Sequence, residues 1–261
     1  MTSTSTVLRA GGVSVSFGGV HALADVSLEV GEGQLVGLIG PNGAGKTTFI
    51  DAISGFVRCQ GKIELAGRDL SAAPPHARAR HGLARTWQST ELFDDLTVEE
   101  NLAVAAAQRQ SVWSTVKETL TVSARTPPAV RETARAFGLE PLMDTLATEL
   151  PQGKRKLIGI ARAFAARPKL VCLDEPAAGL GSEESEELGR RLRGIVDTGT
   201  SLLLVDHDMG LVLSVCDHVV VLDFGKVIAQ GAPEAVRKDP KVITAYLGSA
   251  AAEVVDGGAR P

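Results

Sequence analysis

Hydrophobic and polar residues alternate in three short stretches of the chain. These stretches are 13–17 (VSVSF), 26–30 (VSLEV) and 62–66 (KIELA), and glycines separate them. Alternation places one face of a strand against a core and the other in water. The pattern therefore predicts an antiparallel sheet with one wet face near the start of the chain.

Four other stretches are continuously aliphatic: 34–40 (QLVGLIG), 169–174 (KLVCLD), 201–206 (SLLLVD) and 218–223 (HVVVLD). Such runs are typical of parallel strands covered by helices on both faces. The region 89–162 favours helices. Its stretch 97–110 begins with a capping box, Thr97 and Glu100, and 127–146 holds two further helical segments broken at Gly138 and Pro141. We expect a parallel α/β core, an antiparallel β flap and a helical insert.

Composition fits a globular protein of this size. The 261 residues are 44% hydrophobic and 22% charged with a net charge of −4, which argues against a nucleic-acid partner. Cys59, Cys172 and Cys216 lie far apart in apolar surroundings and are expected to be reduced core residues. Because the chain has neither a membrane-spanning run nor a signal-peptide core, we expect a soluble, cytoplasmic protein that could dock on a membrane. Residues 1–6 and 249–261 are expected to be disordered.

A glycine-rich motif, GPNGAGKTT (40–48), follows the first aliphatic run and precedes a helical stretch. This is the phosphate-binding loop in the strand–loop–helix setting that it requires. Glycines let backbone N–H groups turn towards phosphates, and the helix N-terminus adds a favourable potential. Lys46 would reach the β and γ phosphates, and the Thr47 hydroxyl would bind Mg²⁺. The other candidate ligands are Gly40, Pro41, Asn42, Gly43, Ala44, Gly45 and Thr48. A chance match has a probability on the order of one per cent.

Two further aliphatic runs end in side chains that suit phosphate chemistry. LVCLDEP (170–176) ends in Asp174 and Glu175; the first would hold Mg²⁺ through its water shell, and the second could polarise an attacking water. His207 follows the run 201–206, and the carboxyl ends of parallel strands face one crevice, which favours a γ-phosphate contact. Acidic residues after a strand are often helix caps, and a lone histidine is often structural; the phosphate-binding loop makes both alternatives less favoured.

The stretch LPQGKRK (150–156) places three cations at the start of an apparent helix. The helix dipole is positive there, so each misplaced charge costs about 0.3–1 kcal/mol. Two other residues are ambiguous by themselves. Gln88 lies where the core gives way to the helical insert, and Phe17 follows a β run; one is compatible with a surface residue and the other with core packing.

In this order, the motifs resemble the ATP-binding cassette of ABC transporters over residues 7–248. Phe17 falls at the adenine-stacking aromatic, GPNGAGKTT at Walker A, LVCLDEP at Walker B, and AGLGSEE (178–184) at the D-loop. Gln88 matches the Q-loop and is an expected Mg²⁺ ligand with Thr47 and Asp174, while His207 matches the switch histidine. The signature loop is LPQGK, whose Gln152, Gly153 and Lys154 would contact ATP held by a partner subunit.

The resemblance implies a P-loop NTPase fold of the RecA-like type in one domain, 1–249, with a flexible tail at 250–261. Residues 1–88 and 163–249 would form the core with its antiparallel β subdomain, and 89–162 the helical subdomain. ATP and Mg²⁺ are the implied ligands. The implied partners are a second ATPase subunit (we lean towards a heterodimer), membrane permease subunits and, indirectly, a solute-binding protein outside the membrane.

The finer pattern is closest to ATPase subunits of branched-chain amino acid importers. RTWQSTELFDDLTVEENLAVA, DEPAAGL, DHDMGLV and the C-terminal DPKVITAYLG carry it. Urea or amide importers and lipopolysaccharide exporters share much of it and remain alternatives. A soluble ABC ATPase would have a tandem cassette or long coiled coils, and a small-molecule P-loop kinase would leave LPQGK and His207 unexplained.

Two positions depart from the family pattern. Pro151 replaces the serine of the usual LSGGQ signature and removes a backbone N–H, and Gly181 stands where the D-loop often has aspartate or asparagine. Both put the strength of dimer closure in question. In this family the signature helix points at a partner's ATP, so we assign Lys154 the ligand role. Arg155 and Lys156 are interpreted mainly as surface residues, because consecutive side chains cannot all face one ligand.

Overall fold

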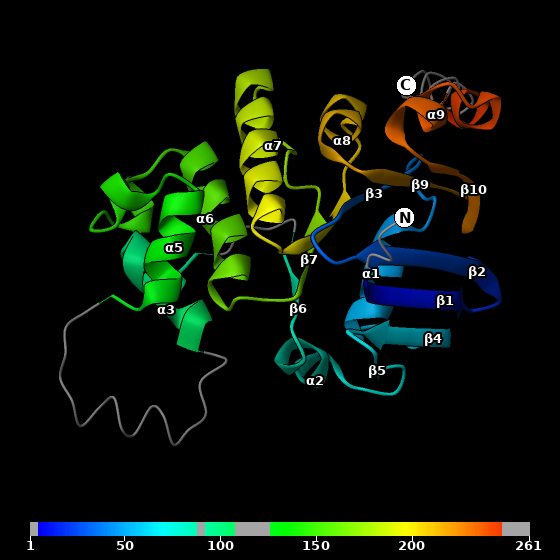
Figure 1. Ribbon diagram of the computed structural model, residues 1–261, viewed down its shortest axis with the longest axis horizontal. Coiled ribbons are helices and arrows are strands. Elements are labelled where there is room, and N and C mark those ends of the chain that lie inside the picture. The colour runs from blue at the N-terminus through cyan, green and yellow to red at the C-terminus, as the bar shows by residue number, and fades with distance from the viewer. Residues whose placement is uncertain (1–4, 88–91, 108–125, 247–261) are drawn as a thin grey trace, which may run out of the picture.

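A computed structural model describes residues 5–87, 92–107 and 126–246. Its centre is a six-stranded sheet of order β10-β9-β3-β8-β7-β6 (Figure 1). The strands are β3 (Leu35–Ile39), β6 (Leu83–Arg85), β7 (Leu170–Asp174), β8 (Ser201–Val205), β9 (His218–Asp223) and β10 (Lys226–Gly231). All neighbours are parallel except β9 and β10. The four continuous aliphatic runs are therefore parallel strands, as expected.

The expected antiparallel flap is a four-stranded sheet of order β2-β1-β4-β5. Its strands are β1 (Thr6–Phe17), β2 (Val20–Gly31), β4 (Gln60–Leu65) and β5 (Arg68–Asp69). The expectation that residues 1–6 are disordered is wrong for the last two of them. Thr6 begins β1, and the Ser5 carbonyl accepts a hydrogen bond of 2.8 Å from the Glu32 N–H, so the sheet fixes this end of the chain.

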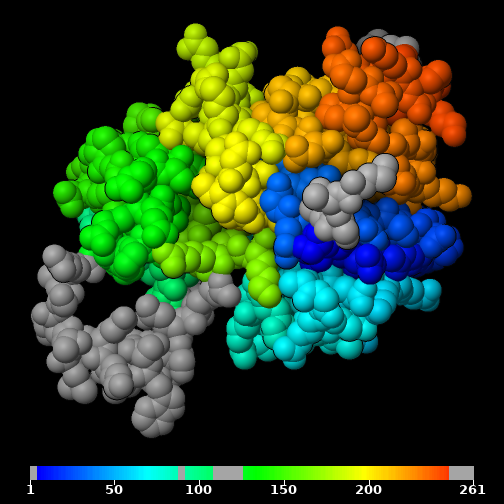
Figure 2. All heavy atoms as spheres, viewed as in Figure 1, coloured from blue at the N-terminus to red at the C-terminus, as the bar shows by residue number. Residues whose placement is uncertain are grey.

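Helices lie on both sides of the parallel sheet and in the insert. They are α1 (Lys46–Ser54), α2 (Pro75–Arg80), α3 (Val98–Ala107), α5 (Pro128–Ala136), α6 (Gln152–Ala165), α7 (Ser182–Asp197), α8 (Met209–Val215) and α9 (Pro233–Arg237), with 3-10 turns at Glu140–Leu142 and Ala147–Glu149. The predicted capping box is present: Thr97 N–H donates to Glu100 at 2.8 Å, and Glu100 N–H donates to the Thr97 hydroxyl at 3.2 Å. Helices α3, α5 and α6 gather at one end of the molecule, opposite the antiparallel strands (Figures 1 and 2).

The central strands contribute side chains to two separate hydrophobic clusters. Along β8, Leu202 and Leu204 face one cluster with α5, α6 and α7, whereas Leu203 and Val205 face the other with α1 and the antiparallel sheet. Both faces of these strands are buried, which is why they lack polar alternation. None of the described helices has the length and apolar character needed to cross a membrane.

The cysteine expectation holds for two of three residues. Cys172 and Cys216 are buried, and burial raises the pKa of Cys172 to about 12. Cys59 is only half-buried.

Candidate active site

The carboxyl ends of three neighbouring parallel strands meet at one edge of the central sheet. In the order β3-β8-β7, these ends lead into the glycine-rich loop, the pair Asp206–His207 and the pair Asp174–Glu175. Ligands of open α/β sheets bind at this edge. The topology therefore brings together three of the sequence motifs that lie far apart along the chain.

The glycine-rich loop depends on two glycines that touch neighbouring backbone. Gly45, which caps α1, has φ 103°, and a Cβ there would lie 2.7 Å from the Ala22 carbonyl oxygen. Gly40 has φ 150°, and its Cβ would overlap the Leu222 carbonyl oxygen. Side chains are excluded at both positions, so the loop curls tightly over the N-terminus of α1. A helix start of this kind is a ready anion site.

Lys46 is folded over this loop. Its ammonium donates to the carbonyl oxygens of Gly40 at 2.7 Å and Pro41 at 2.9 Å. Burial lowers its pKa, while the nearby carboxylates of Glu175 and Asp174 oppose that shift. Lys46 is thus a buried cation beside the acidic pair, and a phosphate would replace the two carbonyls as its partner.

Asp174 has one oxygen committed and one available. Its Oδ2 accepts from Arg85 at 3.2 Å, whereas its Oδ1 is buried and makes no hydrogen bond within the described ranges. Burial raises the pKa of Asp174, and the Arg85 guanidinium opposes the rise. An uncommitted carboxylate oxygen, with the Thr47 hydroxyl on the loop, is the hard oxygen chemistry that Mg²⁺ prefers. These residues fit the metal.

Glu175 and His207 face each other across the end of the sheet. His207 Nδ1 lies 3.9 Å from Glu175 Oε2 and 3.6 Å from Asp206 Oδ1. Glu175 has a left-handed backbone, with φ 47°, and its N–H donates to the Val205 carbonyl at 2.7 Å. The structure therefore places the side chains of Glu175 and His207 together, and a hydrogen bond to β8 holds the Glu175 backbone.

The remaining predicted residues lie away from these contacts. Phe17 is at the end of β1 with its side chain 52% exposed. Gln152 and Lys154 are exposed in the first turn of α6, and Gly153 is half-buried there. Gln88 lies outside the described residues.

The interpretation of Arg155 and Lys156 as surface residues is wrong. Arg155 donates to the Ala147 carbonyl at 2.8 Å and pairs with Asp94 at 2.6 Å. Lys156 donates to the carbonyl oxygens of Ala178 and, at 3.4 Å, Glu175. Helical periodicity shows only the direction of a side chain, whereas other segments of the chain bind and partly bury both residues.

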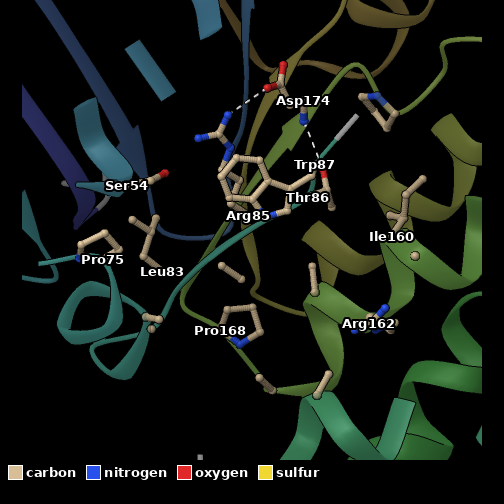
Figure 3. A pocket seen from close by; sticks show the side chains of 18 of the residues that line it. Ser54, Pro75, Leu83, Arg85, Thr86, Trp87, Ile160, Arg162, Pro168 and Asp174 are labelled. Atoms are coloured by element: carbon tan, nitrogen blue, oxygen red, sulfur yellow. Dashed lines mark hydrogen bonds and ion pairs between the residues drawn. The ribbon is translucent and has the colours of Figure 1, made fainter. Parts of the chain in front are cut away.

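Sequence reasoning also missed two residues at the acidic end. Arg85 bridges Asp174 and Asp51 of α1, and its guanidinium carbon lies 4.2 Å from the Trp87 ring centroid (Figure 3). Asp206 is fully buried and accepts from the Ala177 N–H at 3.1 Å. A signal existed for Asp206, which ends an aliphatic strand as Asp174 does; no local pattern marks Arg85.

A cavity of about 690 Å³ opens beside these residues. Arg85, Trp87 and Pro75 line one side, and Ile160 and Arg162 of α6 line the other (Figure 3). Asp174 and Glu175 also border it. The cavity therefore extends from the acidic pair to the junction between the sheet and the helical insert.

Comparisons with known proteins match this arrangement. The ABC transporter family model matches residues 23–178, more than half of the chain, and a branched-chain amino acid ATP-binding cassette transporter model matches 226–252. The chain belongs to the ABC transporter family. It is an ATPase of the transport type, and the expected P-loop fold is confirmed.

Named relatives cover nearly the whole chain. The high-affinity branched-chain amino acid transport ATP-binding protein BraF of Pseudomonas aeruginosa is 37% identical and aligns over 94% of this chain and 98% of its own. The lipopolysaccharide export system ATP-binding protein LptB of Haemophilus influenzae is 36% identical over 93% and 98%. Among solved structures, the ADP conformation of MJ1267, an ATP-binding cassette of an ABC transporter, has a TM-score of 0.79 and 30% identity, covering 94% of this chain and 100% of that one.

Proposed function

We propose that this ATPase powers the uptake of branched-chain or related amino acids across the cytoplasmic membrane, bound to the inner face of that membrane. The C-terminal segment 226–252 carries the proposal, because it matches a branched-chain model and lies outside the catalytic motifs. Relatives named as branched-chain amino acid transport ATP-binding proteins support it.

ATP would bind at the carboxyl edge of the central sheet. The backbone of residues 40–48 and the α1 N-terminus would hold the phosphates, with Phe17 stacking on the adenine. Lys46 would exchange its two carbonyl partners, 2.7 and 2.9 Å away, for the β and γ phosphates. Thr47 and Asp174, with Gln88, would hold Mg²⁺. The metal would neutralise charge on the phosphate oxygens.

Hydrolysis would depend on Glu175 and His207. Glu175 would accept the proton of the water that attacks the γ phosphorus, and the phosphorus–oxygen bond to ADP would break. His207 lies 3.9 Å from that carboxylate. It would contact the γ-phosphate and hold it in position beside Glu175.

Two cassettes would close over two nucleotides. Each site would take its Walker residues from one chain and Gln152, Gly153 and Lys154 from the other. The exposure of Gln152 and Lys154 in the first turn of α6 supports this role, because a partner can reach them there.

A permease subunit would dock at the junction of the sheet and the helical insert. The cavity of about 690 Å³ lies there, beside the half-exposed rings of Trp87 and Phe93. Leu92 packs on the core nearby, and Arg162 lies 4.9 Å from the Phe93 ring centroid. A groove between two subdomains that has both apolar and charged lining residues suits a short amphipathic helix, and its border at Glu175 would link docking to hydrolysis.

The proposal is tested by introducing the substitution Glu175→Gln into this chain in the source cell. The uptake of labelled leucine, valine and urea is then measured. We expect loss of leucine and valine uptake, with urea uptake unchanged. The purified variant should bind MgATP, accumulate an ATP-bound dimer and hydrolyse slowly. Normal leucine uptake would refute the substrate assignment, and near wild-type turnover would remove Glu175 from its catalytic role.

Lipopolysaccharide export is the second candidate, favoured by the 36% identity to LptB. It predicts that the same Glu175→Gln cell keeps leucine uptake and accumulates lipopolysaccharide at the inner membrane. The two candidates share the nucleotide chemistry and differ in the permease, so this pair of measurements separates them.

A further inference from the structure

Lys156 joins helix α6 to the turn that follows β7. It lies on α6 in the helical insert, and its ammonium donates to the carbonyl oxygens of Ala178 and, at 3.4 Å, Glu175. Both acceptors belong to the turn that follows β7 in the parallel core. Burial lowers the pKa of Lys156, and the charges of Asp206 and Glu175 oppose that shift. The contact is thus a half-buried cation bound to main chain.

The turn 175–178 has one internal bond, from the Ala178 N–H to the Glu175 carbonyl at 3.2 Å, and two of its N–H groups donate to β8 and to Asp206 after it. Glu175 N–H donates to the Val205 carbonyl at 2.7 Å, and Ala177 N–H donates to the buried Asp206 carboxylate at 3.1 Å. Lys156 instead donates to carbonyl oxygens of the same turn. The core fixes one side of the turn and α6 fixes the other.

The backbone at Glu175 makes this second attachment consequential. Its φ of 47° lies in the left-handed region, which is unfavourable for a non-glycine residue and persists only where surrounding contacts impose it. One of those contacts is the Lys156 bond to the Glu175 carbonyl itself.

A second contact keeps α6 against the same segment. Gly153, in the first turn of α6, lies so close to Glu184 of α7 that a Cβ would overlap the carboxylate oxygen. Glu184 also accepts from the Gly181 N–H at 3.1 Å at the start of α7. The start of α6 therefore contacts this stretch at two places, at Glu175 and Ala178 through Lys156 and at Glu184 beside Gly153.

We propose that Lys156 is a positioning residue that makes the placement of the Glu175 carboxylate depend on the orientation of α6. The inference rests on the proposed role of Glu175 in hydrolysis. A rotation of the helical insert that displaces the start of α6 by about the length of one hydrogen bond separates the ammonium from the turn. The left-handed backbone at Glu175 then loses a support, and the carboxylate leaves its place. Movement of α6, at the cavity and at the partner-facing signature loop, is thereby communicated to the water-polarising group.

The adjacent residue supplies a matched control. Arg155 occupies the same turn of α6, but its partners, the Ala147 carbonyl at 2.8 Å and Asp94 at 2.6 Å, lie within the helical insert. Arg155→Met removes a cation and two bonds without touching the core turn. Lys156→Met removes the bridge, and Lys156→Arg keeps a donor for it.

The experiment measures kcat and KM for ATP of the purified full chain in wild type and these three variants. Losing charge-assisted hydrogen bonds worth about 1.5–3 kcal/mol corresponds to roughly tenfold or more in rate. We expect Lys156→Met to lower kcat by about that factor with KM within about twofold, and Lys156→Arg to retain most of kcat. Arg155→Met should leave kcat near wild type. If Lys156→Met does not fold, Lys156→Gln replaces it.

Hydrogen exchange of the peptide covering residues 175–180 gives a readout independent of turnover. It should be faster in Lys156→Met than in Arg155→Met. Equal effects of the two substitutions on kcat, a rise in KM alone, or no rescue by Lys156→Arg would overturn the inference. Wild-type turnover by Glu175→Gln would instead refute the proposed role of Glu175, whatever the exchange experiment shows about the bridge.

Discussion

Replacing Arg85 with methionine should impair metal binding at Asp174, although Arg85 itself belongs to none of the nucleotide-binding sequence motifs. Its guanidinium pairs with Asp174 Oδ2 at 3.2 Å and with Asp51 of α1, and the side chains of Arg85 and Asp174 are 6% and 3% exposed. This arrangement leaves Oδ1 available for Mg²⁺. Arg85 therefore holds the carboxylate by one oxygen and presents the other.

The size of the effect follows from burial. Removing one partner of a buried ion pair usually costs 3–5 kcal/mol, because the remaining charge has no counterion. The Arg85–Asp174 bond is longer than an ideal charge-assisted bond and Asp51 is 25% exposed, so we take the low end, about 3 kcal/mol. For a chain of this size, that lowers Tm by roughly 6–12 °C.

The pH dependence has a defined sign. Burial already raises the pKa of Asp174 and Arg85 opposes the rise, so Arg85→Met raises this pKa further. Mg²⁺ binds the carboxylate and not the carboxylic acid. The acidic limb of the pH–activity curve should therefore move to higher pH, and the Mg²⁺ concentration for half-maximal ATPase should rise most at acidic pH.

The assay is ATPase activity against Mg²⁺ and pH, with Asp51→Asn as the control. Asp51 also contacts Arg85, but its charge raises the pKa of Asp174. Its removal should move the acidic limb the other way, or leave it in place. If Arg85 had a purely structural role, neither substitution would shift the acidic limb of the pH–activity curve. An unmoved acidic limb in Arg85→Met, with reduced Tm, would refute the reasoning.

Three other predictions concern different surfaces. Lys154→Glu should leave the ATP affinity of the monomer near normal while ATP-driven dimerisation and hydrolysis fall, whereas Arg155→Met should spare dimerisation. Nucleotide binding and sedimentation are measured for both variants, and equal small effects would contradict the assignment of Lys154 to the partner's nucleotide. Phe93→Glu should abolish transport and leave the basal ATPase of the isolated subunit largely intact, and surviving transport would place the docking surface elsewhere. Alkylation of the native protein should modify Cys59 before the two buried cysteines, as peptide mass mapping can show.

The parallel core could be predicted because burial on both faces leaves a strong mark in the sequence. Strand β8 is SLLLV, and each of its aliphatic residues belongs to one of the two clusters. Strand β6 gives no such signal: its three residues, Leu83 to Arg85, form an edge and end in a charged residue. Its pairing with β7 is a contact over about ninety positions, which no local pattern encodes.

The predicted site residues divide in the same way. Lys46, Asp174, Glu175 and His207 belong to motifs placed at strand ends, and parallel topology alone brings strand ends together. Arg85 and Lys156 act through long-range bonds, to Asp174 and Asp51 and to the turn after β7. Such bonds depend on how two elements pack, so they appear only in three dimensions.

The cations at the start of α6 can now be considered one at a time. The first turn contains no acidic residue and Pro151 supplies no side-chain cap, so the helix dipole disfavours all three charges by about 0.3–1 kcal/mol each. Arg155 offsets its share through Asp94 and a carbonyl, and Lys156 through two carbonyls of the core turn. Lys154 is exposed and makes no ion pair within the ranges that the structure describes. The cation with no internal compensation is thus the one that the family pattern directs at a partner's phosphate. If that anion is what the helix start and Lys154 share, the unfavourable charge in the monomer becomes a favourable one only in the closed, ATP-bound pair.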